Sequence, residues 1–203
     1  MRIEEAIIAY RALSKEYGWK WLALFIRSLS RKSELLRNIR CSTAEEMEFI
    51  KRLPIVSAFY LELASISDAE EALDMMRCVI VPIGLNESMK GFRTLEDSYS
   101  TPMEHLVSYL DSVDGKGAGR FCHREYPKKN DRICHRVVTK CPFHGFFSEV
   151  GTPELTQLFC EVDRVFYEKA FPTLVFHRGD SWENTIAYGK DHCDFIFEPK
   201  KDI

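Results

Sequence analysis

The stretch that decides the fold is TPELTQLFCEVDRVFYEKA (Thr152–Ala170), which is followed at once by TLVFHR (Thr173–Arg178). Thr152 and Pro153 form an N-cap and a first-turn proline, and apolar residues then recur every three or four positions, so the first stretch predicts an amphipathic helix. The second stretch is rich in β-branched and aromatic residues and predicts a strand. A helix and a strand without a repeated βαβ alternation around them indicate an α+β fold.

Further strand candidates lie on both sides of this pair. They are Gly119–Tyr126, Arg132–Thr139, Asn184–Tyr188 and His192–Glu198. Because no helical crossovers separate most of them, we expect a small, mostly antiparallel sheet with covering helices.

The first half of the chain predicts helices. Two capping-box patterns, at 42–45 and 67–70, each open a helix, and Pro82 with Gly84 is expected to end the second of these. We therefore expect a helical N-terminal half packed on the small C-terminal sheet. The expected organisation is a single domain of residues 1–203, with a helical portion 1–113 and an α+β portion 114–203 that carries the candidate site.

The composition is that of an ordinary globular protein. The 203 residues are 45% apolar and 29% charged, and 28 Lys and Arg against 31 Asp and Glu leave a net charge of −3. Without a basic stripe, no nucleic-acid partner is expected. The first residues, MRIEEAIIAYR, carry two acids, and no stretch approaches the ~20 apolar residues of a membrane span. We therefore expect a cytoplasmic protein without a signal peptide or a membrane partner.

Cysteines place chemistry in the second half of the chain. Four of the seven lie between Cys122 and Cys160, and in a reducing compartment they serve as thiols, metal ligands or nucleophiles rather than as disulfides. On the expected helix, spacings of three and four bring Cys160, Asp163 and Tyr167 to one flank of the apolar stripe. A thiol and a carboxylate sheltered there are placed where pKa values shift. In the alternative interpretation, Cys160 only packs and Asp163 is solvated.

Two strand residues are candidates for the same site. Alternation along the last strand directs Cys193 to the core side. Arg178 shares a face with Leu174 and Phe176 in its own strand, and an unpaired charge among core residues is costly. Arg178 therefore either lies at the exposed end of its strand or reaches an anion, such as a ligand carboxylate or Asp163.

Metal binding is an open alternative. Cys141-x-x-His144 is half of a zinc motif, but no second pair completes a structural finger. Cys160 and Cys193, converging with Asp163 from a helix and a strand, would suit zinc or iron with an open position for water. The cofactor is otherwise unknown.

The C-terminal half carries a series of motifs in a fixed order: Cys141-Pro142, Pro153-Glu154-Leu155, Cys160-x-x-Asp163, Pro172 to Arg178, Thr185-Ile-Ala-x-Gly189 and Cys193-Asp194-Phe195. This order resembles the L-2-amino-thiazoline-4-carboxylic acid hydrolase family, by motif over roughly residues 100 to 198 and by general layout in the helical first half. The closing Gly-x-x-x-Cys-x-Phe is also similar to the 4-vinyl reductase domains, which are small-molecule sensor modules.

The first resemblance implies a hydrolase that opens a small cyclic amidine, such as 2-amino-thiazoline-4-carboxylate, to N-carbamoyl-L-cysteine. Cys160 or Cys193 would be the nucleophile or a metal ligand. Asp163 would be the general acid–base group or the partner that orients a catalytic thiol. Arg178 would anchor the substrate carboxylate, and Thr185 would donate a hydrogen bond. Thiolate attack and metal-activated water both remain open. This hypothesis predicts that Cys160, Asp163, Arg178 and Cys193 converge on one pocket that takes a small-molecule substrate.

Two other interpretations stand beside the hydrolase. One is a non-catalytic small-molecule or metal-binding module of the 4-vinyl reductase type. The other is a homodimer formed through the helical half, in which the cysteines only pack.

Overall fold

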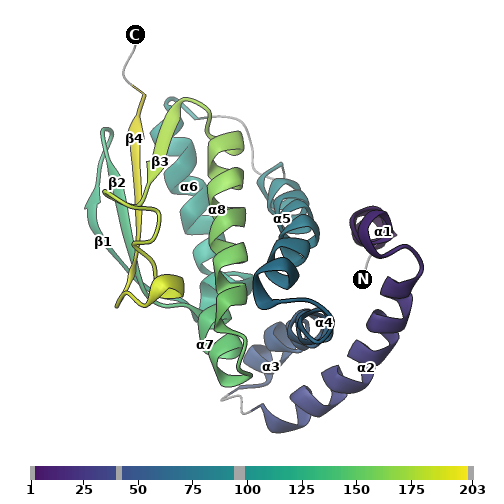
Figure 1. The fold of residues 1–203 in the computed structure, drawn as a ribbon. Helices are drawn as coiled ribbons and strands as arrows, with labels where there is room; N and C mark the ends of the chain where they lie inside the picture. The colour runs from purple at the N-terminus through teal and green to yellow at the C-terminus, as the bar shows by residue number, and fades with distance from the viewer. Residues whose placement is uncertain (1–2, 40–42, 94–98, 201–203) are drawn as a thin grey trace. The chain divides into compact units, whose positions relative to one another are not determined.

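The computed structural model describes residues 3–39, 43–93 and 99–200 and confirms the α+β fold with a helical N-terminal half (Figure 1). The chain divides into two compact units. Unit 1 consists of residues 1–84 and 146–159, and unit 2 consists of residues 85–145 and 160–203. No helix among the described residues has both the length and the apolar character that a bilayer crossing needs.

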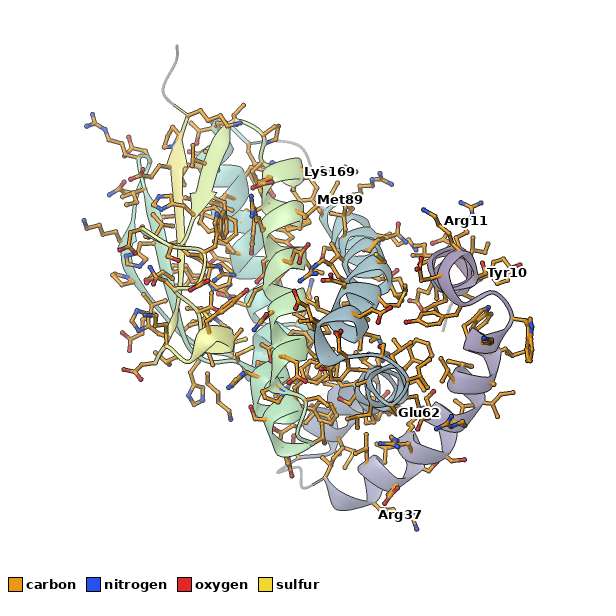
Figure 2. The ribbon with its side chains drawn as sticks, in the orientation of Figure 1. Tyr10, Arg11, Arg37, Glu62, Met89 and Lys169 are labelled. Atoms are coloured by element: carbon orange, nitrogen blue, oxygen red, sulfur yellow. The ribbon has the colours of Figure 1, made fainter. Side chains whose placement is uncertain are left out.

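Unit 1 is helical. A buried carboxylate holds two of its helices together: Glu62 on α4 (Pro54–Ala64), labelled in Figure 2, forms an ion pair with Arg27 at 2.8 Å and accepts a hydrogen bond from Arg31 at 2.9 Å, both on α2 (Lys20–Asn38). A buried charge needs such partners, and here they fix α4 against α2. The helices are α1 (Ile3–Tyr17), α2 (Lys20–Asn38), α3 (Ala44–Ile50), α4 (Pro54–Ala64), the first part of α5 (Ala69–Phe92) and the adjoining parts of α7 (Pro142–Glu149) and α8 (Thr156–Ala170).

The expected end of one helix is wrong. Pro82 and Gly84 lie inside α5, which continues to Phe92. An interior proline costs about 3 kcal/mol of helix stability. Packing on both sides of it offsets that cost, since Met76 is buried before the proline and Met89 packs into the core of unit 2 after it.

The caps that were expected near residues 42 and 67 lie one residue further along. Residue 42 is outside the described residues, and Thr43 caps α3 by accepting from the backbone N–H of Glu46. Asp68 accepts from the backbone N–H of Glu71 at the start of α5. Such one-residue differences are common, because neighbouring Ser, Thr and Asp residues cap equally well.

Unit 2 contains the sheet. Its described strands are β1 (His123–Lys129), β2 (Cys134–Lys140), β3 (Leu174–His177) and β4 (Cys193–Pro199), in the antiparallel order β1-β2-β4-β3. In Figure 1, α6 (Pro102–Asp114) and α8 lie along one face of this sheet. The short 3₁₀ turn η2 (Pro153–Leu155) precedes α8.

Two strand predictions need correction. The stretch Asn184–Tyr188 is not a strand but contains the 3₁₀ turn η3 (Ile186–Tyr188), which ends at Gly189 with φ of +81°. Only glycine enters that left-handed region readily, so Gly189 ends the turn and redirects the chain into β4. The first strand begins at His123 rather than at the predicted Gly119, because η1 (Gly117–Phe121) occupies the first part of the predicted range.

Aromatic residues fill the core of unit 2. Tyr167 on α8 lies at ring-centre distances of 4.8 Å from Phe197 and 5.0 Å from Phe176. Phe176 and Phe197, which are directly paired between β3 and β4, stack at 4.8 Å. Burial of these rings on one face of the sheet fixes the register, since a slip of one residue would turn them to solvent.

We expect Phe197→Ala to lower the free energy of unfolding by about 3–5 kcal/mol, because Phe197 is fully buried and its removal leaves a cavity. Val175→Ala on the exposed side of the neighbouring strand is the matched control and should cost about 1 kcal/mol or less. Chemical denaturation of both variants measures this. Equal losses would contradict the assignment of the core face.

Candidate functional site

A buried arginine forms the centre of the cluster. Arg178 follows the last residue of β3 and is only 1% exposed. It donates to the backbone carbonyl of Asp194 at 3.1 Å and to Oδ2 of Asp163 at 3.3 Å. Its guanidinium carbon lies 4.2 Å from the centre of the Phe195 ring. Of the two expected positions for Arg178, the exposed strand end is therefore wrong, and the contact with Asp163 is confirmed.

The Asp163 side chain is surrounded by protein and is still partly accessible to solvent. Burial raises the pKa of its carboxyl group, while Arg178 and then Arg136 oppose that rise. The side chain nevertheless keeps 40% of its surface accessible. The carboxylate is thus surrounded by protein and still reachable by a water-sized molecule. A carboxyl group with a raised pKa in such surroundings is suited to general acid–base chemistry.

The two predicted cysteines are protonated thiols in the neutral range. Burial raises the pKa of Cys160 to about 12, and Arg178 opposes that rise. Burial likewise raises the pKa of Cys193 to about 11, although its sulfur accepts a hydrogen bond from the backbone N–H of Ile186 at 3.2 Å. Because the thiolate is the nucleophilic form, neither cysteine is pre-activated in the resting protein.

Thr185 lies at the start of a hydrogen-bonded turn, with its side chain close to Cys160. Its side chain is fully buried, and its Oγ1 lies 3.9 Å from the sulfur of Cys160. The Thr185 carbonyl accepts from the N–H groups of Tyr188 and Lys190, which closes the turn that Gly189 ends. The Thr-x-Ala-x-Gly motif therefore specifies a backbone geometry as well as a side chain.

The loop between Arg178 and Thr185 is ordered by internal contacts. Asn184 donates to the Arg178 carbonyl at 2.9 Å and to the Asp180 carboxylate at 2.7 Å. Trp182 packs against the Phe176 ring at 5.4 Å and beneath the Arg164 guanidinium at 4.6 Å. The bulk of this loop is thus used for packing within unit 2.

Two charged residues near the cluster were not expected from the sequence. Arg136 on β2 is 6% exposed, and its Nη2 donates to Asp114 at the end of α6 over 2.5 Å. The signal for Arg136 was present, since alternation places it on the same face as Cys134 and Val138, and this is the argument that singled out Arg178. Asp114 precedes a glycine-rich turn, and nothing in the pattern marks it.

The residues do not offer a complete metal site. Across residues 3–39, 43–93 and 99–200, no three His, Cys, Asp or Glu side chains gather closely enough to hold an ion. Cys160, Cys193 and Asp163, the ligands considered from the sequence, therefore do not form the set of three close protein ligands that a catalytic zinc or iron site of this type needs. We therefore derive no chemical step through a metal.

A pocket of about 300 Å³ lies elsewhere in unit 2. It is lined by residues 99–102 and His105 at the start of α6 and by residues 170–173 after α8. None of the predicted site residues lines it. Its lining has hydroxyls, rings and the imidazole of His105 but no carboxylate, lysine, arginine or thiol, so it offers one acid–base group but neither a thiol nor a cationic anchor for a carboxylate.

A comparison with models of protein families identifies the family of the chain. A family model described as L-2-amino-thiazoline-4-carboxylic acid hydrolase matches residues 48–197, which include every residue of the cluster around Arg178. The chain belongs to this family. The resemblance is therefore confirmed, and the match also covers part of the helical half.

Other comparisons add little to the family assignment. None of the curated proteins matches the chain. Among solved structures, an Fe(II) unliganded H-NOX protein from K. algicida aligns over 100% of this chain and 98% of its own, with 9% identity and a TM-score of 0.37. That likeness is too slight to inform fold or function.

We expect Cys160 and Cys193 to react slowly with iodoacetamide at pH 7 and to react faster as the pH rises, because their pKa values of about 12 and about 11 keep them protonated. Cys78, exposed on α5, is the internal control that reacts first. Peptide mass spectrometry after timed alkylation measures each site. Rapid labelling of Cys160 below pH 7 would show an activated thiolate and contradict this expectation.

Proposed function

We propose that this protein is a hydrolase that opens a small cyclic amidine bearing a carboxylate, such as 2-amino-thiazoline-4-carboxylate, to N-carbamoyl-L-cysteine. The observation that carries the proposal is the contact between buried Arg178 and Asp163, whose carboxylate a water-sized molecule can reach. Family membership supports the same reaction class.

The reaction needs one water molecule. Its oxygen adds to the amidine carbon of the ring, one of its protons passes to the ring nitrogen, and the bond from that carbon to sulfur breaks. The second proton passes to the sulfur, which leaves as a thiol, while the oxygen becomes the carbonyl of a urea. The protein must therefore hold the carboxylate, take a proton from water and return one to sulfur.

Asp163 is suited to both proton transfers. In its ionised form it accepts the proton of the attacking water, and in its protonated form it donates to the leaving sulfur. The raised pKa brings the two forms closer to balance than in an ordinary aspartate. Arg178 nearby would stabilise the negative charge that develops during ring opening.

Arg178 is also suited to binding the substrate carboxylate. A guanidinium carries five N–H donors in a planar fork. The contacts with Asp163 and the Asp194 carbonyl each use one terminal nitrogen, and neither contact is bidentate. Donors therefore remain for a ligand oxygen.

The cysteines and Thr185 have supporting roles in this proposal. Cys160 as a neutral thiol lies beside Thr185, and both can hydrogen-bond to the amino group or the sulfur of the ring. Nucleophilic attack by Cys160 would first require Asp163, one helical turn further along, to take the thiol proton. Cys193 supports the turn through its bond from Ile186.

A non-catalytic binding module is the second candidate. The observation that favours it is the protonated state of both thiols, since a binding site has no need of an activated nucleophile. It predicts tight binding of the amidine without turnover.

Incubation with 2-amino-thiazoline-4-carboxylate and detection of N-carbamoyl-L-cysteine test the proposal. We expect turnover by the wild type. In Asp163→Asn, kcat should fall by about 100-fold or more, because the acid–base group is lost. Glu168→Gln on the exposed face of the same helix is the matched control and should leave kcat unchanged. The wild-type rate should fall as the pH drops through a pKa above the ordinary aspartate value, since the attacking water needs ionised Asp163.

Two results would contradict separate parts of this proposal, the hydrolase activity and the role of Asp163. Binding of the amidine without product would favour the binding module. Full activity in Asp163→Asn would remove Asp163 from the chemistry.

A further inference from the structure

Arg136 has a buried donor without an acceptor. Its side chain keeps only 7% of its surface accessible, and its Nε finds no hydrogen-bond partner among the described residues. Leaving a buried charged donor without a hydrogen bond costs more folding free energy than leaving a neutral donor without one. An acceptor oxygen beside this Nε would remove that cost, and the described residues do not supply one.

The neighbouring aspartate cannot supply that oxygen. Asp114 binds Nη2 of Arg136 through Oδ1 at 2.5 Å. Its Oδ2 forms an ion pair with Nε of Arg124 at 2.8 Å and accepts a hydrogen bond from the hydroxyl of Tyr126 at 2.6 Å. Both carboxylate oxygens are thus engaged, and they hold the Arg136 guanidinium in one orientation.

Arg136 and Arg178 share one aromatic ring. Their guanidinium carbons lie 5.4 Å and 4.2 Å from the centre of the Phe195 ring. Phe195 is the residue directly opposite Arg136 in the pairing of β2 with β4. Both arginines also act on the Asp163 carboxyl group. The unpaired donor therefore belongs to the neighbourhood of Arg178 and Asp163.

Positive charge is in excess there. Arg124 and Arg136 both pair with Asp114, and Arg178 pairs with Asp163. Three cations against two anions leave one positive charge in a partly buried cluster. Such an excess favours an anionic ligand.

We propose that Arg136 is a second anion-binding residue, which holds a ligand carboxylate through Nε together with Arg178. This inference rests on the proposed function for the identity of the ligand. It adds a specificity: a ligand without the carboxylate loses contacts with two arginines and leaves the excess charge unpaired.

The test compares two ligands that do not turn over: N-carbamoyl-L-cysteine and its decarboxylated analogue, (2-sulfanylethyl)urea. Calorimetry measures their binding to the wild type, Arg136→Gln and Arg136→Lys. We expect the wild type to prefer the carboxylate ligand by at least ~10-fold, as for a charge-assisted pair. Both Arg136 variants should lose most of that preference, while binding of the decarboxylated ligand stays within about threefold of wild type.

Arg124→Gln is the matched control. It removes another arginine from Asp114 but no unpaired donor, so it should lower the melting temperature and keep the ligand preference. Arg136→Lys retains the charge beside Asp114 and covers the case in which Arg136→Gln does not fold.

The outcomes separate this inference from the proposed function. A wild-type preference that the Arg136 variants retain, or no preference in the wild type, overturns the role of Arg136, whatever the turnover. A preference lost in the variants supports it. If the wild type then fails to hydrolyse 2-amino-thiazoline-4-carboxylate, the hydrolase proposal fails while the anion site stands.

Discussion

Burial of the Arg178 guanidinium is the constraint on which the rest of unit 2 depends. A charge at 1% exposure is tolerated only when its donors and its faces are occupied. Asp163 supplies an opposite charge, the Asp194 carbonyl supplies an acceptor and the Phe195 ring supplies a π-face. Removing one partner from such a group costs about 3–5 kcal/mol, so α8, β3 and β4 are tied together through this side chain.

The same constraint explains why the family motifs cluster. Cys160-x-x-Asp163 places the carboxylate one helical turn after the thiol. Thr185 and Gly189 build the turn that delivers the chain into β4, where Cys193 and the residues that contact Arg178 follow. These residues support the fold, and the chemistry proposed above assigns contact with the substrate to the same groups that neutralise Arg178.

Most of the structure of the C-terminal half could be predicted from the sequence. The wheel of α8 placed Cys160 and Asp163 on one flank, and strand alternation placed Arg178 among core residues, because both patterns depend only on local periodicity. What failed depended on tertiary packing. The sequence predicts that Pro82 ends its helix, but the helix continues because residues on both sides of the proline pack in the core. It also predicts a strand at Asn184–Tyr188, but this stretch forms a turn that ends at the left-handed Gly189.

The candidate site shows the same division. Arg136 obeys the alternation rule that revealed Arg178, so it was readable in principle. Its significance depends on Asp114, which is 22 positions away and which only the folded chain brings into contact. The protonated state of the thiols was likewise beyond the sequence, because desolvation depends on which side chains surround each sulfur.

The most direct test of the central claim is an NMR titration of the Asp163 carboxyl carbon in the wild type and in Arg178→Gln. The Asp163 carboxylate, paired with buried Arg178, should titrate above the ordinary aspartate value in the wild type, because desolvation is the largest effect on its pKa. In Arg178→Gln it should titrate higher still, because the group that lowers its pKa most is gone. An ordinary aspartate pKa that does not change between the two proteins would contradict the buried pair.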